Sequence, residues 1–480
     1  MEEKRVTQIT KKSTNFAKWY NNIVLKAELA DYSPVKGCMI IRPYGFAIWE
    51  NIQKKLDQMI KQAGIKNAYF PLFIPENFLK KEKEHVEGFS PELVVATIGG
   101  GQKLAENLIL RPTSETIIYT MYSKWIKSWR DLPLLINQWC NIVRWEKRTY
   151  LFLRTTEFLW QEGHTCHSSH QEALKETQRA LDMYTELYRN FLAIDGIMGK
   201  KSPSQKFPGA LDTYTYEMLM PDGKALQGCT SHDLGQNFSK PFNISFQNKN
   251  GKREYVWQTC WGFSTRSIGG LIMAHGDDQG LIFPPKIAPI QVVIVPIWSE
   301  KTRKSITNYC QRVENRLKKK KMRVHFDNRR EYSPGWKFNL WELKGVPIRL
   351  EIGPSDIKAS QVTMACRDGI KIPVLLKRLE AETEKHLRLI QQDYLLRKSS
   401  DFLRKNTHEV NSYDEFKKIM EDKRGFIRAF WCENPKCEEA IKHETKASTR
   451  CLPLDAKKEK DRCIYCGQPS NYQWIFAQAY

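Results

Sequence analysis

Two neighbouring stretches of the sequence decide the fold: LRPTSETIIYTMYSKWI at residues 110–126 and INQWCNIVRWEKRTYLFLRTTEFLWQEGH at residues 136–164. The first places the polar triplet 113–115 directly before an apolar run with helical spacing, so it predicts a helix that begins at that triplet. The second contains an apolar, strand-like run that ends at Arg144, a basic connection, and a second run that starts at Arg154. This pattern predicts an antiparallel hairpin with an arginine at each end.

Such a hairpin has the side chains that a nucleoside triphosphate requires. Guanidinium groups form paired hydrogen bonds with phosphate oxygens, and an aromatic ring on the return run, Phe158, can stack on a base. The alternative is an ordinary half-buried hairpin with charged, solvated edges. For each residue taken singly this alternative is the better interpretation, so the functional interpretation depends on the order of the surrounding motifs.

Length and charge set the broad class of the protein. A chain of 480 residues is long enough for two to four domains. It contains no uninterrupted apolar run near the ~20 residues that span a bilayer, and its first residues, MEEKRVTQITKK, lack the apolar core of a secretory signal. We therefore expect a cytoplasmic protein without membrane contact. The net charge of +22 favours nucleic acid as a partner, although a lysine-rich proteome would explain it equally well.

Four of the twelve cysteines form two closely spaced pairs near the end of the chain. Cys432 and Cys437 are separated by four residues, and Cys463 and Cys466 by two. Thiolates at such spacing suit tetrahedral Zn²⁺, and in a reducing compartment a metal is favoured over disulfides. Cys451 lies between the pairs and is an alternative ligand, but the two local pairs are preferred.

The order of the words RPTSE, VRWE and LRTTEFLWQEGH resembles motif 2 of the class II aminoacyl-tRNA synthetases. More narrowly, it resembles the archaeal and eukaryotic type of prolyl-tRNA synthetase. Residues 212–239 resemble the substrate-binding segment of that family, residues 255–285 its motif 3, and residues 37–64, with Pro43, its motif 1. The resemblance extends from about residue 15 to Tyr480, whose equivalent in the family packs back toward the active site.

The resemblance implies a mixed α/β (α+β) fold in three parts. Residues 1–285 would form the class II catalytic domain around an antiparallel sheet, and residues 286–395 an α/β anticodon-binding domain. Residues 396–480 would form a small C-terminal zinc-binding α/β module. Two residues depart from the family pattern in the anticodon-binding part, Ser355 after Gly-Pro and Cys366, so the usual anticodon contacts are in doubt at these positions.

The implied activity is that of a proline--tRNA ligase, which uses ATP with Mg²⁺ to form prolyl-adenylate and transfers the prolyl group to the 3′ end of tRNA(Pro). By position in the motifs, Arg144 and Arg266 would be catalytic. The implied ATP-binding residues are Arg144, Glu146, Arg154, Thr155, Phe158, Gln227, Thr230, Ser264 and Arg266. The implied proline-binding residues are Thr113, Glu115, Arg144, Trp160, Glu162 and His232. Motif 1 implies a homodimer, and structural Zn²⁺ would be held by Cys432, Cys437, Cys463 and Cys466.

Three further expectations separate this enzyme from its relatives. Only about ninety residues lie between Glu162 and Tyr255, which predicts that no editing domain is inserted there. A relative that binds RNA or ATP without charging tRNA would have lost the motif arginines, which are present. An enzyme for threonine is disfavoured by the words around Trp160 and His232, and no metal-ligand cluster is expected in the catalytic core.

Overall fold

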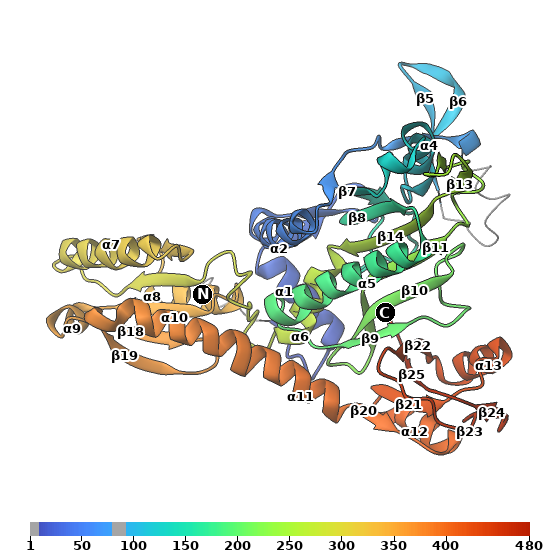
Figure 1. Cartoon of the computed structure of the whole chain (residues 1–480). Helices are drawn as coiled ribbons and strands as arrows, with labels where there is room; N and C mark the ends of the chain where they lie inside the picture. The colour runs from blue at the N-terminus through green and yellow to red at the C-terminus, as the bar shows by residue number, and fades with distance from the viewer. Residues whose placement is uncertain (1–8, 79–92) are drawn as a thin grey trace.

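The computed structural model describes residues 9–78 and 93–480 (Figure 1). Its largest element is an 11-stranded sheet with the order β20-β21-β25-β22-β9-β10-β11-β14-β8-β7-β3. The strands from the first two thirds of the chain are β3 (Lys66–Asn67), β7 (Leu134–Val143), β8 (Glu157–His167), β9 (Ile197–Lys200), β10 (Asp212–Leu219), β11 (Ala225–Gly235) and β14 (Trp257–Ser264). The strands from its end are β20 (Thr407–Glu409), β21 (Phe426–Phe430), β22 (Ser448–Pro453) and β25 (Gln473–Ala477).

The hairpin predicted from the sequence is the pair β7 and β8. The two strands are antiparallel, with Leu134 opposite Cys166 at one end and Val143 opposite Glu157 at the other. The predicted helix is α4 (Glu115–Trp125), which begins directly after Ser114. Neither prediction needed tertiary information, because the strand alternation and the helical spacing are both local.

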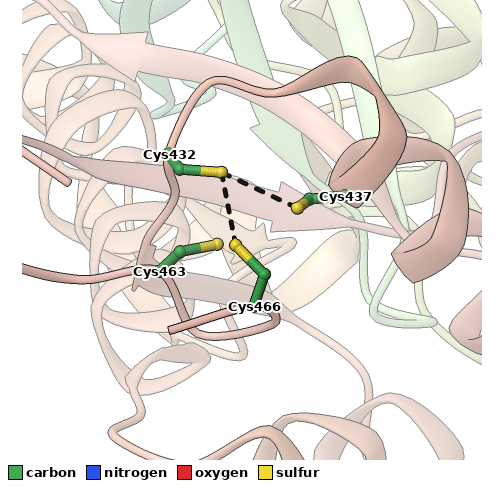
Figure 2. Close-up of side chains that lie close together, drawn as sticks. All are labelled: Cys432, Cys437, Cys463 and Cys466. Carbon is green, nitrogen blue, oxygen red and sulfur yellow. Dashed lines mark hydrogen bonds between the residues drawn. The ribbon is translucent and has the colours of Figure 1, made fainter. Parts of the chain in front are cut away.

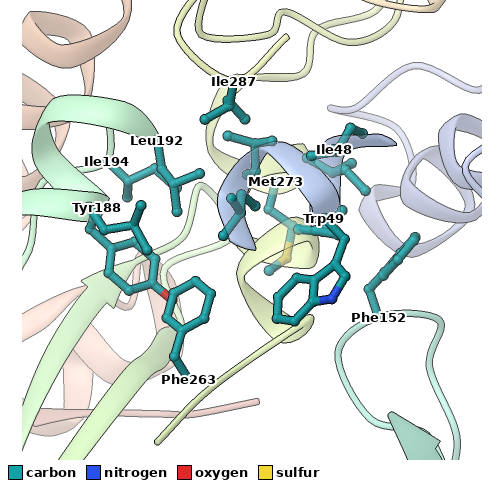
Figure 3. Packing of buried hydrophobic residues seen from close by; sticks show 14 of the residues in the cluster. Ile48, Trp49, Phe152, Tyr188, Leu192, Ile194, Phe263, Met273 and Ile287 are labelled. Carbon is teal, nitrogen blue, oxygen red and sulfur yellow. The ribbon is translucent and has the colours of Figure 1, made fainter. Parts of the chain in front are cut away.

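Helices cover the faces of the large sheet and enclose one large core. The helices are α1 (Phe16–Lys26), α2 (Pro43–Gln62), α4, α5 (His170–Glu186), its π-helical continuation η2 (Leu187–Phe191), and α6 (Arg266–His275). Figure 3 shows part of this core, in which Trp49 of α2 stacks on Phe263 of β14 with ring centroids 6.2 Å apart. This packing holds β14 and the start of α6 in place beside the hairpin.

Three small sheets and a short 3-10 helix, η1 (Trp129–Asp131), complete this part of the chain. The first sheet pairs β1 (Ala30–Tyr32) with β2 (Met39–Ile41), and another pairs β12 (Ser245–Gln247) with β13 (Arg253–Tyr255). The third contains β4 (Phe73–Pro75), β5 (Val94–Gly99) and β6 (Gln102–Leu110), and β6 leads into the Thr113 segment.

A second α/β region follows, with the strand order β16-β15-β17-β18-β19. Its strands are β15 (Val292–Pro296), β16 (Val324–Phe326), β17 (Ile348–Ile352), β18 (Gln361–Cys366) and β19 (Lys371–Leu375). Its helices are α7 (Arg303–Lys319), α8 (Pro334–Leu343) and α9 (Pro354–Lys358). Ser355 is exposed at the start of α9, whereas Cys366 is buried in β18.

One long helical run joins this region to the end of the chain (Figure 1). It consists of η3 (Leu376–Arg378), α10 (Leu379–Leu389), η4 (Ile390–Leu396) and α11 (Arg397–Lys405). The last residues form α12 (Tyr413–Asp422), α13 (Pro435–Thr445), β23 (Asp461–Arg462) and β24 (Pro469–Ser470), together with strands of the large sheet. Among the helices of the described residues, none has the length and apolar character that a bilayer crossing requires.

The C-terminal strands β22, β25, β21 and β20 continue the large sheet beyond β9. Leu452 of β22 pairs with Lys200 of β9, and Pro453 pairs with Gly199. The approach is close, because a Cβ on Gly199 would lie 2.5 Å from the Cys451 sulfur. The C-terminal module is therefore joined to the earlier strands of the large sheet by main-chain hydrogen bonds.

Candidate active site

A cavity of about 380 Å³ opens over the β7–β8 hairpin, β11, β14 and the start of α6. It gathers every residue that the sequence analysis assigned to ATP or proline. These are Thr113, Glu115, Arg144, Glu146, Arg154, Thr155, Phe158, Trp160, Glu162, Gln227, Thr230, His232, Ser264 and Arg266. They come from segments more than a hundred residues apart, and the antiparallel sheet brings them together.

Three arginines place positive charge along one side of this cavity. Arg144 donates through Nε to the Pro112 carbonyl at 2.9 Å, and Arg266 donates through Nε to the Leu153 carbonyl at 3.1 Å. Arg154 pairs with Glu146 at 2.6 Å. Loss of solvation and then the charge of Arg144 lower the pKa of Arg266, which shows that these guanidinium groups repel one another. Such a cluster favours a polyanion in the cavity.

Two aromatic rings lie beside the arginines. Phe158 and Trp160 contact each other edge to face, with centroids 6.1 Å apart, and the guanidinium carbon of Arg144 lies 5.7 Å from each ring centroid. The indole N–H of Trp160 points to the Cys140 sulfur at 3.1 Å. The cavity therefore offers a flat apolar surface next to positive charge, as a base followed by phosphates requires.

At the base of the cavity, Glu162 is buried and held by several donors. It accepts from Ser114 Oγ at 2.5 Å, Gln138 Nε2 at 2.9 Å and Cys140 Sγ at 3.4 Å, and it pairs with His164 Nε2 at 2.9 Å. Loss of solvation alone would raise the pKa of Glu162, but the hydrogen bond and charge of His164 lower it. Glu162 is thus an ionised carboxylate whose oxygens are occupied by the protein itself.

Glu115 is the second buried carboxylate of the cavity. Thr113 Oγ1 donates to its Oε2, and the Cys260 thiol points to its Oε1 at 3.3 Å. Burial, followed by the negative charge of Glu115, raises the pKa of Cys260 well above its ordinary value. Cys260 is therefore a neutral thiol beside the Glu115 carboxylate, and both residues line the cavity.

His232 closes the far wall in a neutral state. Its Nδ1 lies 2.9 Å from Thr213 Oγ1, and burial, together with the nearby His164, lowers its pKa to about 3. The ring of Phe207 lies against it, with centroids 4.8 Å apart. Phe207 and the neutral His232 therefore add no charge to the cavity.

The sequence matches families and individual proteins of known function along nearly its whole length. Three family models match: "tRNA synthetase class II core domain (G, H, P, S and T)" over residues 96–275, "Anticodon binding domain" over 291–381 and "Prolyl-tRNA synthetase, C-terminal" over 413–480. The proline--tRNA ligase of Natranaerobius thermophilus is 51% identical, and the alignment covers 100% of this chain and 99% of that protein. The proline--tRNA ligase of Borreliella burgdorferi is 50% identical over 98% of this chain and 99% of its own length.

The chain belongs to the prolyl-tRNA synthetase family. A crystal structure of the prolyl-tRNA synthetase from Cryptosporidium parvum, complexed with halofuginone and AMPPNP, superimposes with a TM-score of 0.94. It is 41% identical and covers 100% of this chain and 99% of its own. The predicted family and the class II fold are thus confirmed.

In this prolyl-tRNA synthetase, the four predicted cysteines meet in the C-terminal module (Figure 2). Their sulfurs all lie within 4.8 Å of one another, and Cys432 Sγ is 3.7 Å from the sulfurs of both Cys437 and Cys466. A tetrahedral zinc with Zn–S bonds of about 2.3 Å separates its sulfurs by about 3.8 Å, so the four residues fit Zn²⁺. Cys451 is buried in β22 beside Gly199 and is not part of this cluster.

A second group of potential ligands corrects one expectation for the synthetase core. Glu115, His164 and Cys260 bring ligand atoms within 4.8 Å of one another, although no metal-ligand cluster was expected there. The three residues lie on different elements, and only the register that sets Cys260 opposite His164 reveals the group. Both ring nitrogens of His164 already have partners, Glu162 and Tyr119 Oη, so hydrogen bonding accounts for the group as it stands.

Some residues of the synthetase pocket were missed by the sequence analysis. His164 does not line the cavity but hydrogen-bonds to Glu162, which does. It could have been found, because the two residues are two apart on one strand and side chains at that spacing share a face. Phe207 and Cys260 had no local signal, since a loop and a neighbouring strand bring them to the pocket. The end of the chain does return to the core, where the Tyr480 amide donates to Ala225 O at 3.3 Å.

Proposed function

We propose that this chain activates L-proline with ATP, forming prolyl-adenylate and pyrophosphate, and then transfers the prolyl group to the 3′ end of tRNA(Pro). The observation that carries the proposal is a single cavity lined by three arginines, two aromatic rings, the buried carboxylates of Glu115 and Glu162, and the neutral His232. The proline carboxylate attacks the α-phosphate in line, so catalysis consists of positioning and charge stabilisation and needs no protein nucleophile.

In this proposal the arginines bind the nucleotide and the developing charge. Arg144 lies between the aromatic rings and the carboxylates, where it can contact both the α-phosphate and the proline carboxylate. Arg154 and Arg266 hold the outer phosphates, and Phe158 stacks on adenine. Mg²⁺, when bound with the nucleotide, neutralises phosphate charge. The remaining contacts to ATP come from Glu146, Thr155, Gln227, Thr230 and Ser264.

Proline is distinguished by its secondary ammonium group, which carries two N–H donors. Thr113 and Glu115 supply an acceptor and a carboxylate for it, and Glu115 lines the cavity beside Arg144. Trp160, Glu162 and neutral His232 shape the space for the ring. Such a pocket excludes larger amino acids but rejects alanine poorly, since a missing methylene is worth only ~1–3 kcal/mol.

The same proposal assigns the other regions. Residues 1–285 form the catalytic domain, 286–395 bind the tRNA anticodon, and 396–480 hold structural Zn²⁺ through Cys432, Cys437, Cys463 and Cys466. The segment between β8 and β14 contains α5, η2 and strands β9–β13, which supports the prediction that no editing domain is inserted there. Any proofreading would then be done by another protein. We further propose a cytoplasmic homodimer that joins through the motif 1 region.

Amino-acid-dependent ATP–pyrophosphate exchange tests the activation step. We expect exchange with proline, weaker but detectable exchange with alanine, and none with threonine. Arg144→Ala should lower the exchange rate about a hundredfold or more, the usual effect of removing one charge-stabilising donor. Arg148→Ala removes an exposed arginine from the same hairpin connection and should leave the rate unchanged. Exchange with threonine and not with proline would overturn the proposal in favour of another substrate. No exchange with any amino acid would favour an RNA-binding relative.

A further inference from the structure

The connection between β9 and β10, residues 202–211, forms one wall of the active-site cavity, and we call it the pocket loop. Gln205, Lys206, Phe207 and Pro208 of this loop line the cavity. Phe207 is the part that faces the proposed proline site, since its ring lies 4.8 Å from His232. The shape of the pocket loop therefore sets the shape of the amino-acid subsite.

A tight turn at Ser202 determines where Phe207 lies. The amides of Gln205 and Lys206 both donate to the Ser202 carbonyl, at 3.0 and 2.9 Å. The next amide, that of Phe207, donates to Thr213 Oγ1 at 2.9 Å, and the same hydroxyl contacts His232 Nδ1. A displacement of Ser202 would thus move the turn and, through it, the aromatic wall of the pocket.

A carboxylate from the C-terminal module holds this turn. Glu438 is on α13, directly after Cys437, and is 4% exposed. It accepts hydrogen bonds from Ser202 Oγ at 3.1 Å, from Ser204 Oγ and from Thr449 Oγ1 of β22. The Thr449 hydroxyl also lies 3.0 Å from Ser202 Oγ. Two of the three donors therefore belong to the pocket loop, 234 and 236 residues away in sequence.

A buried carboxylate is a costly way to fill this space. Burial of a charge is unfavourable unless several donors compensate for it, whereas hydrogen bonds to a charged acceptor are shorter and stronger than neutral ones. Three hydroxyl donors that converge on one carboxylate fix all four residues in position. The arrangement costs solvation energy and gains a defined position for the loop.

We propose that Glu438 is a positioning residue for the amino-acid subsite. By holding Ser202 and Ser204, it fixes the pocket loop so that Phe207 lies against His232. The inference rests on the proposed activation of proline, but the clamp itself is a structural property that can be tested without that activity. It predicts that the C-terminal module tunes recognition of the amino acid, which its distance in sequence from the motifs gives no reason to expect.

Hydrogen exchange tests the clamp directly in the full chain. Glu438→Gln replaces one acceptor oxygen of the carboxylate with an amide N–H donor, and we expect the amides of residues 205–207 to exchange about fivefold faster, the effect of losing one ordinary hydrogen bond. Glu439→Gln makes the same change at the adjacent exposed residue and should leave these amides as in the wild type. Unchanged exchange in Glu438→Gln would overturn the clamp, whether or not the protein activates proline.

The kinetics of ATP–pyrophosphate exchange then test whether the clamp affects recognition of proline. Glu438→Gln should raise the KM for proline about fivefold while kcat and the KM for ATP stay within about twofold. Ser204→Ala removes one donor at an exposed position, should give a smaller rise in the same parameter, and serves if Glu438→Gln does not fold. The two changes should be non-additive in the double variant, because they remove one shared interaction.

Two measurements separate the possible failures. Zinc content should be equal in the wild type and Glu438→Gln, because Glu438 follows Cys437 in the sequence but is not one of the four proposed zinc ligands. Equal loss of kcat for all substrates would indicate general damage to the fold and contradict the positioning role. A wild-type protein without proline-dependent exchange would refute the proposed function, and the hydrogen exchange of residues 205–207 would still decide the clamp.

Discussion

At the scale of the residue, Glu162 and His164 form a buried ion pair of 2.9 Å below the proposed proline site. Burial opposes both charges, but the hydrogen bond and mutual attraction lower the pKa of Glu162 and raise the pKa of His164. The glutamate stabilises the fold above its ordinary pKa of 4.5, and this contribution is lost as the pH falls through the lowered value. The histidine stabilises it below its ordinary pKa of 6.5, and this contribution is lost as the pH rises through the raised value.

The pair should therefore contribute most near pH 5–6, between these ordinary values. His164→Gln can keep a hydrogen bond but not the charge, so its apparent melting temperature should fall below that of the wild type by roughly 4 °C at pH 6. The difference should shrink as the pH rises toward 9. Differential scanning calorimetry across this range measures it, with the exposed His443→Gln as the control. A difference that stays constant with pH would show that the pair is not charged in the folded protein.

The sequence predicted the residues of the cavity that lie in local motifs and missed those that depend on register. Arg144 and Phe158 follow from their places in the hairpin, because the strand pattern and the motif order are both visible in one stretch. Cys260 reaches Glu115 only because β14 pairs with β8 in the register that sets it opposite His164. Nothing in the local sequence specifies which of the possible strand partners and registers is adopted.

At the scale of the element, each of the two cysteine pairs lies on its own short segment of the C-terminal module. Cys432 lies before α13 and Cys437 lies in its first turn, whereas Cys463 and Cys466 lie between β23 and β24. Each pair could be predicted from its short spacing, since both ligands come from one turn. The exclusion of Cys451 required the fold, because its strand faces β9 and places the sulfur against Gly199.

Zinc content should follow this geometry. Cys466→Ser removes one of the four ligands, so the purified protein should contain much less than one zinc per chain and should unfold at a lower temperature. Cys451→Ala removes a buried sulfur outside the cluster and should keep about one zinc per chain. Metal analysis by mass spectrometry, together with a thermal scan, measures both properties. Zinc retained in the first variant and lost in the second would reverse the assignment of the ligands.

At the scale of the whole molecule, buried charges join the C-terminal module to the catalytic sheet. Glu217 of β10 pairs with Lys201 at 2.6 Å and with Arg450 of β22 at 2.8 Å, and all three side chains are buried. The cost of burying these charges is offset only while the two regions stay together. The family resemblance implied a separate terminal module, but the pairing of β22 with β9 links residues about 250 apart, which no local pattern could show.

The anticodon-binding region is fixed on the same core by ion pairs at its edge. Arg367 pairs with Asp277 at 2.8 Å, and Lys344 pairs with Glu28. In the same region, α7 ends at Lys319, and the residues Lys318, Lys319 and Lys320 around its end are exposed. With a net charge of +22, the molecule is suited to bind a polyanion far larger than ATP.

Salt should therefore separate the two steps of the reaction. For about four phosphate contacts, raising the salt concentration from about 50 to 200 mM should raise the KM for tRNA about a hundredfold in aminoacylation assays. Proline-dependent pyrophosphate exchange needs no tRNA and should change far less, because it involves none of the contacts to the tRNA phosphates. The double variant Lys319→Glu/Lys320→Glu should weaken tRNA binding at low salt and reduce this dependence while leaving exchange intact. If the variant kept the wild-type salt dependence, the phosphate contacts would have to lie on another surface of the molecule.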